Sequence, residues 1–308
     1  MSAPQTTRHA VLYFPSRDTG VLPVSGDGWF LARDIPLGIM PLRHGAGDRS
    51  VKVELQPHDD KVAEWLTSFL YIGQFEPRYL ERAVEDFVQT AASYIGYYGE
   101  IYFDITEDND GRPARLRPLP HGRILRSPRK YLQIIPKADR QHRDGHRYVA
   151  IAKQSLWRLG LPKELGTARS YRRLVRRLSE LSPLGNPLAL PSPDATSPSG
   201  YDFVVHRDAC ERLQEKALRK WGTVLSKQSP VGPSTEYFYI ARRLSFHRSQ
   251  ARLREHVIAE LNSLLARLDI AHSIVVSGIP TAEDIGTTLN HLHKGEIGFK
   301  DALDRTSI

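Results

Sequence analysis

Short apolar runs separated by glycine, proline and aspartate are the main pattern of the first sixty residues. The runs at 10–14, 21–24, 29–31 and 51–55 are rich in branched and aromatic residues, which fit the pleated, half-buried surface of a strand. The glycine and proline residues between them favour tight turns. We therefore expect residues 1–60 to form a strand-rich segment.

After Asp59 the pattern changes to the spacing of amphipathic helices. The apolar positions that share a helical face are Val62, Trp65, Leu66, Phe69 and Leu70, then Leu80, Val84, Phe87, Val88 and Ala91. Asp59 and Asp60 are suited to capping the start of the first helix. Pro77 suits the first turn of the second helix. Gly96 and Gly99 predict its end.

Two pairs of strands are expected next. Residues 101–105 are branched and aromatic, residues 114–119 alternate in polarity, and the Asp-Asn-Asp-Gly sequence at 108–111 between them is typical of a turn. This combination predicts a β-hairpin. Residues 131–135 and 148–152 predict a second pair, joined by a polar loop.

A basic helix, a proline-rich stretch and a mainly helical region complete the chain. The helix is expected over 168–181, where Tyr171, Leu174, Val175 and Leu178 share one face. Residues 184–200 contain four prolines among Ser, Thr and Asn, a composition that cannot sustain a helix or a central strand. Beyond them, helices are expected over 207–227, 253–268, from Thr281 onward and over 299–303, with extended segments at 237–240 and 274–276.

Taken together, these elements predict an α+β fold rather than a regular βαβ alternation. We expect four regions. They are a strand-rich N-terminal segment 1–60, a mixed region of helices and β-hairpins 61–183, a Pro/Ser-rich linker or loop 184–200, and a mainly helical C-terminal region 201–308.

Charge is distributed very unevenly along the chain. The 308 residues have a net charge of +8, but residues 1–111 carry 9 Lys/Arg and 17 Asp/Glu, a net of −8. Residues 112–177 carry 19 Lys/Arg and 3 Asp/Glu, a net of +16. Such asymmetry points to a polyanionic partner or to contact with another subunit. The alternative is that the acidic and basic segments pair within one chain.

Composition also excludes several classes of protein. A single cysteine excludes a disulfide framework and a Cys-rich zinc module. No apolar run approaches the roughly 18 residues that a membrane helix needs, and residues 1–20 lack the pattern of a secretory signal. We expect a soluble protein without a membrane partner, either cytoplasmic or associated with a virion.

No catalytic motif is recognisable. The chain has no phosphate-binding loop, no Gly-x-Gly-x-x-Gly after a strand and no His-Glu-x-x-His. The close histidine pairs, His142 with His146 and His291 with His293, lack a further positioned ligand. Five carboxylates lie near the hairpin: Glu100, Asp104, Glu107, Asp108 and Asp110. Such a cluster suggests a two-metal nuclease, but turns favour aspartate for backbone reasons alone. We expect no catalytic residue, no metal and no cofactor.

The arginines of the basic segment are the candidate contact residues. Arginine binds phosphate and carboxylate through two parallel hydrogen bonds, so these side chains suit a nucleic-acid or subunit contact. The candidates in the basic helix are Arg169, Arg172, Arg173, Arg176 and Arg177. A second run contains Arg123, Arg126, Arg129 and Lys130.

The hairpin and its flanks resemble portal proteins of tailed phages. The residues that carry the resemblance are Tyr98-Gly99-Glu100-Ile101-Tyr102-Phe103-Asp104-Ile105, Asp110-Gly111-Arg112-Pro113, Leu116-Arg117-Pro118-Leu119-Pro120 and Arg123-Ile124. In those portal proteins a helix ends in a Tyr-Gly step, and a strand, a glycine-containing turn and a return into Leu-x-Pro-Leu-Pro follow. The resemblance covers about residues 60–150. It implies a ring-forming structural protein through which DNA passes, without catalytic residues of its own.

Two functions are therefore carried forward. The first is a structural, portal-like protein whose subunits meet head to tail, so that an acidic segment of one faces a basic segment of the next. The alternative is a non-catalytic nucleic-acid-binding subunit of a defence or mobile-element complex that uses residues 112–177. Either function predicts a nucleic acid as partner, DNA in the first case, and a homo-oligomer or a larger complex.

Overall fold

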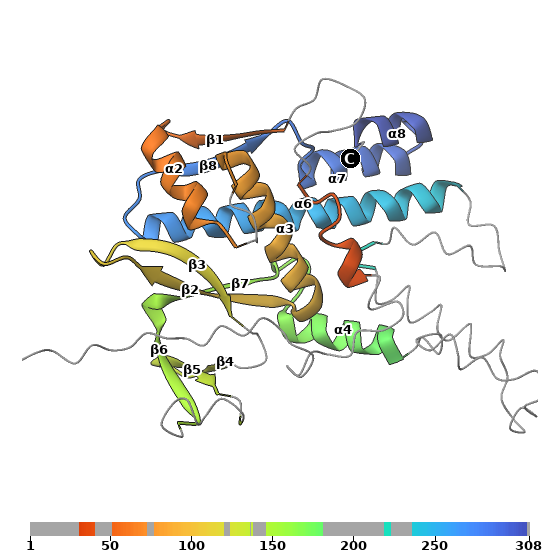
Figure 1. Ribbon diagram of the computed structural model, residues 1–308. Coiled ribbons are helices and arrows are strands. Elements are labelled where there is room, and N and C mark those ends of the chain that lie inside the picture. Colours follow the sequence, from red (N-terminus) through yellow and green to blue (C-terminus); the bar gives the residue numbers. More distant parts are fainter. Residues whose placement is uncertain are drawn as a thin grey trace, which may run out of the picture.

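The computed structural model describes residues 31–40, 51–72, 77–119, 124–135, 137, 146–180, 219–222 and 236–306. They form an α+β fold with three small antiparallel sheets (Figure 1), so the expected fold class is confirmed. The helices are α2 (Asp60–Phe69), α3 (Leu80–Tyr98), α4 (Ala168–Glu180), α6 (Glu236–Arg267), α7 (Ala282–His293) and α8 (Phe299–Arg305). The strands are β1 (Lys52–Gln56), β2 (Glu100–Glu107), β3 (Pro113–Leu119), β4 (Ile124–Arg126), β5 (Lys130–Ile134), β6 (Tyr148–Ala152), β7 (Leu156–Gly160) and β8 (Ser273–Ser277).

Helices α2 and α3 follow the expected pattern with two corrections. Asp59 caps α2, because its carboxylate accepts hydrogen bonds from the backbone N–H groups of Lys61 and Val62 at 2.9 and 3.1 Å. Helix α3 begins at Leu80 rather than near Pro77, and it ends at Gly99 alone.

Gly96 lies inside α3 instead of ending it. Its missing side chain lets residues 31–34 pack closely, since an added Cβ would lie 2.7 Å from the carbonyl oxygen of Ala32. Residues 31–34 are helical. The strand expected over 29–31 is therefore wrong at Leu31.

The central sheet has the order β3-β2-β7, and β2 is its buried middle strand. The expected hairpin is confirmed, with Ile105 opposite Leu116 in β3. On the other side of β2, Phe103 lies opposite Trp157. These two rings and Phe87 of α3 pack with centroids 5.3 to 5.9 Å apart, which fixes α3 against one face of the sheet.

The sheet β4-β5-β6 contains the second expected strand pair, and Tyr131 lies opposite Ile151 in it. It packs on the central sheet through a separate apolar cluster. The members of this cluster are Tyr102, Leu119, Ile124, Ile151 and Leu156.

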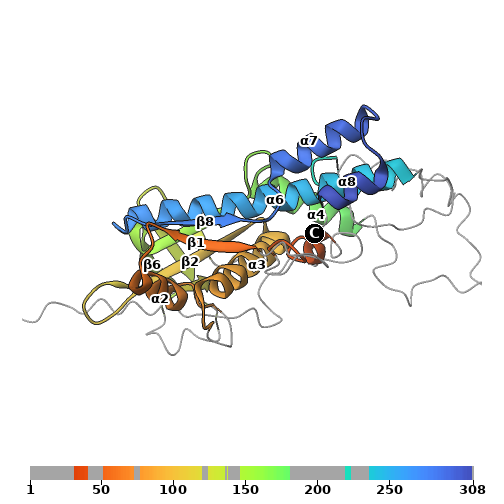
Figure 2. The same cartoon turned by 90° about the horizontal axis from the view of Figure 1, so that it is seen from above.

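Helix α6 crosses the molecule between two cores (Figure 1). Leu253, Val257 and Leu261 join the main core with α2, α3 and the sheets, whereas Ile240 and Leu244 pack against α7 and α8. Figure 2 shows the β1-β8 ribbon between α6 and the α2–α3 pair.

Residues 237–240 are helical, so the extended conformation expected there is wrong. Ile240 is fully buried in the α6–α7–α8 cluster and Tyr237 packs against it. These tertiary contacts override the strand propensity of the aromatic run.

A relay of hydrogen bonds connects α6 to residues 31–40. Arg243 Nε donates to His247 Nε2 at 3.3 Å, so the proton of the neutral ring lies on Nδ1, which faces Gln250 Oε1 at 3.0 Å. Gln250 Nε2 then faces the carbonyl oxygens of Asp34, Ile35 and Leu37 at 3.2, 3.0 and 2.8 Å. One turn later, Arg254 donates to the carbonyl oxygens of Ile39 and Pro280.

Some expectations fall outside the described residues. Residues 184–200 do so entirely, as do 207–218 and 223–227 of the expected helix, and the division into regions stays a prediction. The helices from Thr281 and Phe299 and the strand at 274–276 are confirmed. None of the described helices combines the length and apolarity needed to cross a membrane.

Because of the relay, stability should depend on the protonation of His247. Burial lowers the pKa of His247 below its ordinary 6.5; the Gln250 bond opposes this and Arg243 adds to it. At a pH between the lowered pKa of His247 in the folded protein and the ordinary 6.5, the unfolded chain binds more protons than the folded one. The free energy of unfolding should therefore fall as the pH drops below about 6.5. Urea denaturation at several pH values should show that the free energy of unfolding depends less on pH in H247N than in the wild type. The variant H58N, at an exposed position, should keep the pH dependence of the wild type. If both variants lost the pH dependence equally, its assignment to His247 would be contradicted.

Candidate nucleic-acid interface

Helix α4 presents an arginine face to solvent. Its start is fixed by reciprocal hydrogen bonds: the Thr167 N–H donates to Ser170 Oγ at 2.9 Å, and the Ser170 N–H donates to Thr167 Oγ1 at 3.1 Å. One side of the helix is buried through Tyr171, Val175 and Leu178. The exposed arginines of the other side are Arg169, Arg173, Arg176 and Arg177.

Tyr171 anchors α4 to α3. Its hydroxyl donates to the carbonyl oxygen of Gly96 at 2.6 Å, and its ring packs against Trp221 with centroids 5.3 Å apart. Burial raises the pKa of Tyr171 well above its usual range, so the hydroxyl remains a donor. Gly99 permits the close approach of the two helices, because an added Cβ would lie 2.9 Å from the Ala168 Cα.

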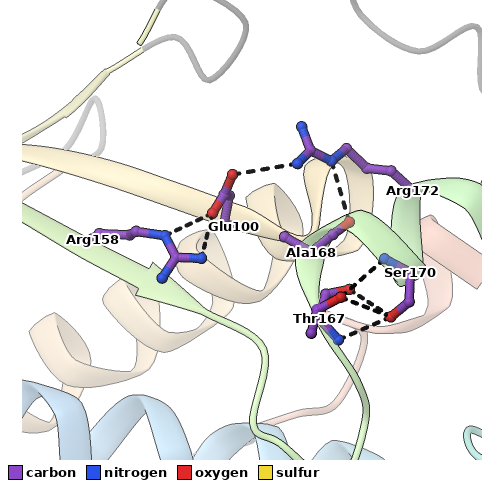
Figure 3. Close-up of polar contacts among 6 residues, drawn as sticks. All are labelled: Glu100, Arg158, Thr167, Ala168, Ser170 and Arg172. Atoms are coloured by element: carbon purple, nitrogen blue, oxygen red, sulfur yellow. Dashed lines mark hydrogen bonds and ion pairs between the residues drawn. The ribbon is translucent and has the colours of Figure 1, made fainter. Parts of the chain in front are cut away.

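Arg172 does not belong to the exposed arginine face. Its Nη2 lies 3.6 Å from Glu100 Oε1, and its Nε donates to the carbonyl oxygen of Ala168 at 3.2 Å (Figure 3). Glu100 begins β2, and its side chain is only 7% exposed. The candidate contact residue Arg172 is therefore partly buried and shares an ion pair with Glu100 of the same chain.

The same carboxylate binds Arg158 of β7. Arg158 Nε and Nη2 both lie 2.7 Å from Glu100 Oε2, and Figure 3 shows Glu100 between the two arginines. Burial alone would lower the pKa of Arg158, but the charge and hydrogen bond of Glu100 raise it overall. Glu100 thus connects β2, β7 and α4.

The second run of candidate residues lies on the β4–β5 turn. Arg126 ends β4, Lys130 begins β5, and the Ser127 N–H donates to the Lys130 carbonyl oxygen at 3.0 Å. Arg126, Arg129 and Lys130 are exposed. Arg123 lies outside the described residues.

The structure brings the candidates together in two groups rather than one. Four exposed arginines lie on α4, and three exposed basic residues lie at the β4–β5 turn. In Figure 1 both elements lie below the central sheet, at opposite ends of it.

Two of the carboxylates near the hairpin, Asp108 and Glu100, bind groups within the chain. Asp108 Oδ1 accepts hydrogen bonds from the N–H groups of Asp110 and Arg112 at 2.9 and 2.8 Å, which is an Asx turn. Glu100 is bound by arginines. Among the described residues, no group of three or more His, Cys, Asp and Glu side chains is placed to hold a metal ion.

Sequence reasoning missed the role of Glu100. The residue stands directly after the Tyr-Gly step, but its partner Arg158 is 58 residues away. No local spacing signals such a pair. A charged residue directly before the apolar and aromatic run Ile101-Tyr102-Phe103 is the hint that the sequence offers.

Comparison with known proteins finds similarity among solved structures. No family model and no curated protein matches the chain. Among solved structures, it is similar to an HK97 family phage portal protein from Corynebacterium diphtheriae, with 11% identity, 83% of this chain and 96% of that chain covered, and a TM-score of 0.40. The match agrees with the weak resemblance to portal proteins seen in the hairpin. At this identity and TM-score it carries no conclusion about activity.

Removing the Glu100 charge should destabilise the protein. In E100Q the half-buried Arg158 and Arg172 lose their carboxylate, and we expect the free energy of unfolding to fall by about 2 kcal/mol, less than for a fully buried pair because both arginines are partly solvated. Urea denaturation measures this change. The control E64Q, at an exposed position of α2, should change stability by less than about 0.5 kcal/mol. An E100Q protein as stable as the wild type would contradict the assigned role.

Proposed function

We propose that this protein is a structural, portal-like component that forms a ring and contacts DNA as it passes. The observation that supports the proposed DNA contact is the exposed arginine face of α4. The hairpin that carries the portal resemblance is folded as expected, and it supports the structural role. Its position in the cell or virion follows from this role: we propose that it is associated with a virion.

The α4 arginines are suited to a partner outside the chain. Among the described residues, Arg169, Arg173, Arg176 and Arg177 make no ion pair with a carboxylate, unlike Arg172. Four guanidinium groups on one anchored helix can contact several phosphates of a nucleic-acid backbone. The β4–β5 turn supplies three further cations.

The alternative function is a nucleic-acid-binding subunit of a defence or mobile-element complex. It uses the same arginine face and needs no ring. The four free arginines support both functions equally, and the two proposals differ in stoichiometry.

Reversing the α4 charges should abolish binding to DNA. The variant R169E/R173E/R176E/R177E leaves the Glu100 pair intact, and we expect the affinity for duplex DNA and its dependence on salt concentration both to fall, by about one unit of logarithmic slope per lost phosphate contact. Fluorescence anisotropy at several salt concentrations measures both quantities.

The matched control carries the same change of charge elsewhere. The variant K52E/K61E/K300E/R305E reverses four exposed cations on β1, α2 and α8. It should retain most of the affinity. Equal loss in the two variants would show a general effect of net charge and would exclude α4 as the interface.

The ring is tested by the mass of the particle in solution. Size-exclusion chromatography with light scattering should give a closed oligomer of several subunits, because head-to-tail interfaces generate rings. A protein that stays monomeric at high concentration would exclude the ring, and DNA binding by that monomer would support the alternative.

A further inference from the structure

Two arginines of α6 lie in a pocket that the α4 site does not use. Arg248 and Arg252 are one turn apart and line a cavity of about 690 Å³ between α6, α7 and the loop at residues 162–164. Thr287 and Asn290 of α7 also line it. The pocket therefore combines two guanidinium groups with a hydroxyl and an amide.

Neither arginine has a partner within the described residues. Arg248 Nε is buried without a hydrogen-bond acceptor. The Arg248 guanidinium lies against Gly286, where an added Cβ would be 2.9 Å from its central carbon. Burial lowers the pKa of Arg248, and the charge of the neighbouring Arg252 lowers it further.

Two carboxylates near the pocket, Glu255 of α6 and Asp284 of α7, bind other groups. Glu255 Oε1 accepts a hydrogen bond from the Ala282 N–H at 2.7 Å, at the start of α7. Asp284 forms the capping box with Thr281. Because buried polar groups are nearly always hydrogen-bonded, an oxyanion that enters the pocket from another molecule would supply the acceptor that Arg248 Nε lacks.

The charges around the pocket favour a carboxylate over a phosphate chain. Glu164, Glu255 and Glu283 line the same cavity as the two arginines. These three glutamates repel the closely spaced charges of a nucleic-acid backbone. A single carboxylate can pair with Arg248 and Arg252 without approaching the glutamates. The acidic residues also suit a basic neighbour on the same peptide.

We infer that the Arg248–Arg252 pocket binds a single glutamate or aspartate side chain of a peptide segment from a protein partner. Arg248 and Arg252 hold the carboxylate, and Thr287 and Asn290 supply neutral hydrogen bonds. This inference does not depend on the ring or on DNA binding by α4.

A labelled glycine-rich peptide with one glutamate next to one lysine tests the pocket in the full chain. Fluorescence anisotropy should show binding of this peptide and not of its glutamine counterpart. R248Q and R252Q should each weaken binding about tenfold, the effect of losing one charge-assisted hydrogen bond. G286S should weaken it as well, because the added side chain displaces the guanidinium without changing the charge. R305Q, at an exposed position of α8, should bind as the wild type does.

Several results would overturn the inference. They are absence of peptide binding, unchanged binding by both R248Q and R252Q, equal loss in R305Q, or displacement of the peptide by inorganic phosphate or duplex DNA at equal concentration. Thermal denaturation monitors the fold of each variant, and R252Q provides the test if R248Q does not fold. Light scattering on the same variants distinguishes the source of the peptide: a lost oligomer identifies a second copy of this chain, and an unchanged mass identifies a different protein.

Discussion

Two polar side chains buried along α6 hold the surrounding elements in place. Gln250 and Arg254 are each 2% exposed, and the hydrogen bonds that their N–H groups donate end on backbone carbonyl oxygens. They therefore fix the path of residues 31–40 and of the chain before α7. A buried carbonyl oxygen without a hydrogen-bond donor destabilises the folded protein, so these donors are needed where they lie. Burial also lowers the pKa of Arg254 to about 10. The helix thus organises the fold by hydrogen bonding as well as by apolar contact.

Elements with local signals could be predicted from the sequence, and those that depend on distant contacts could not. The cap at Asp59 and the turn at 108–111 are encoded within a few residues, and both were predicted. Residues 237–240 have the composition of a strand but become helical, because α7 and α8 bury Ile240. In the candidate site, the exposed arginines follow from helical spacing. The pairing of Arg172 with Glu100 joins segments that are remote in sequence.

The basic excess of residues 112–177 divides into two kinds of arginine. Arg158 and Arg172 neutralise Glu100 inside the protein, and Arg115 donates to the Tyr71 carbonyl oxygen with its guanidinium 4.3 Å from the Tyr71 ring. Pairing within the chain therefore accounts for part of the asymmetry. The four exposed arginines of α4 remain available for a partner.

The orientation of those arginines depends on the hairpin segment itself. Gly99 brings the start of α4 against the end of α3, and Glu100, the next residue, holds Arg172 on the inner side of the helix. Tyr171, Val175 and Leu178 form the buried face of α4, and residues spaced this way share one side of a helix. The opposite side therefore carries the four exposed arginines. The Tyr-Gly-Glu sequence that carries the family resemblance is thus also the segment that orients the arginine face. A change there should disturb the fold and the proposed DNA contact together, whereas a change on the outer face of α4 should affect only the contact.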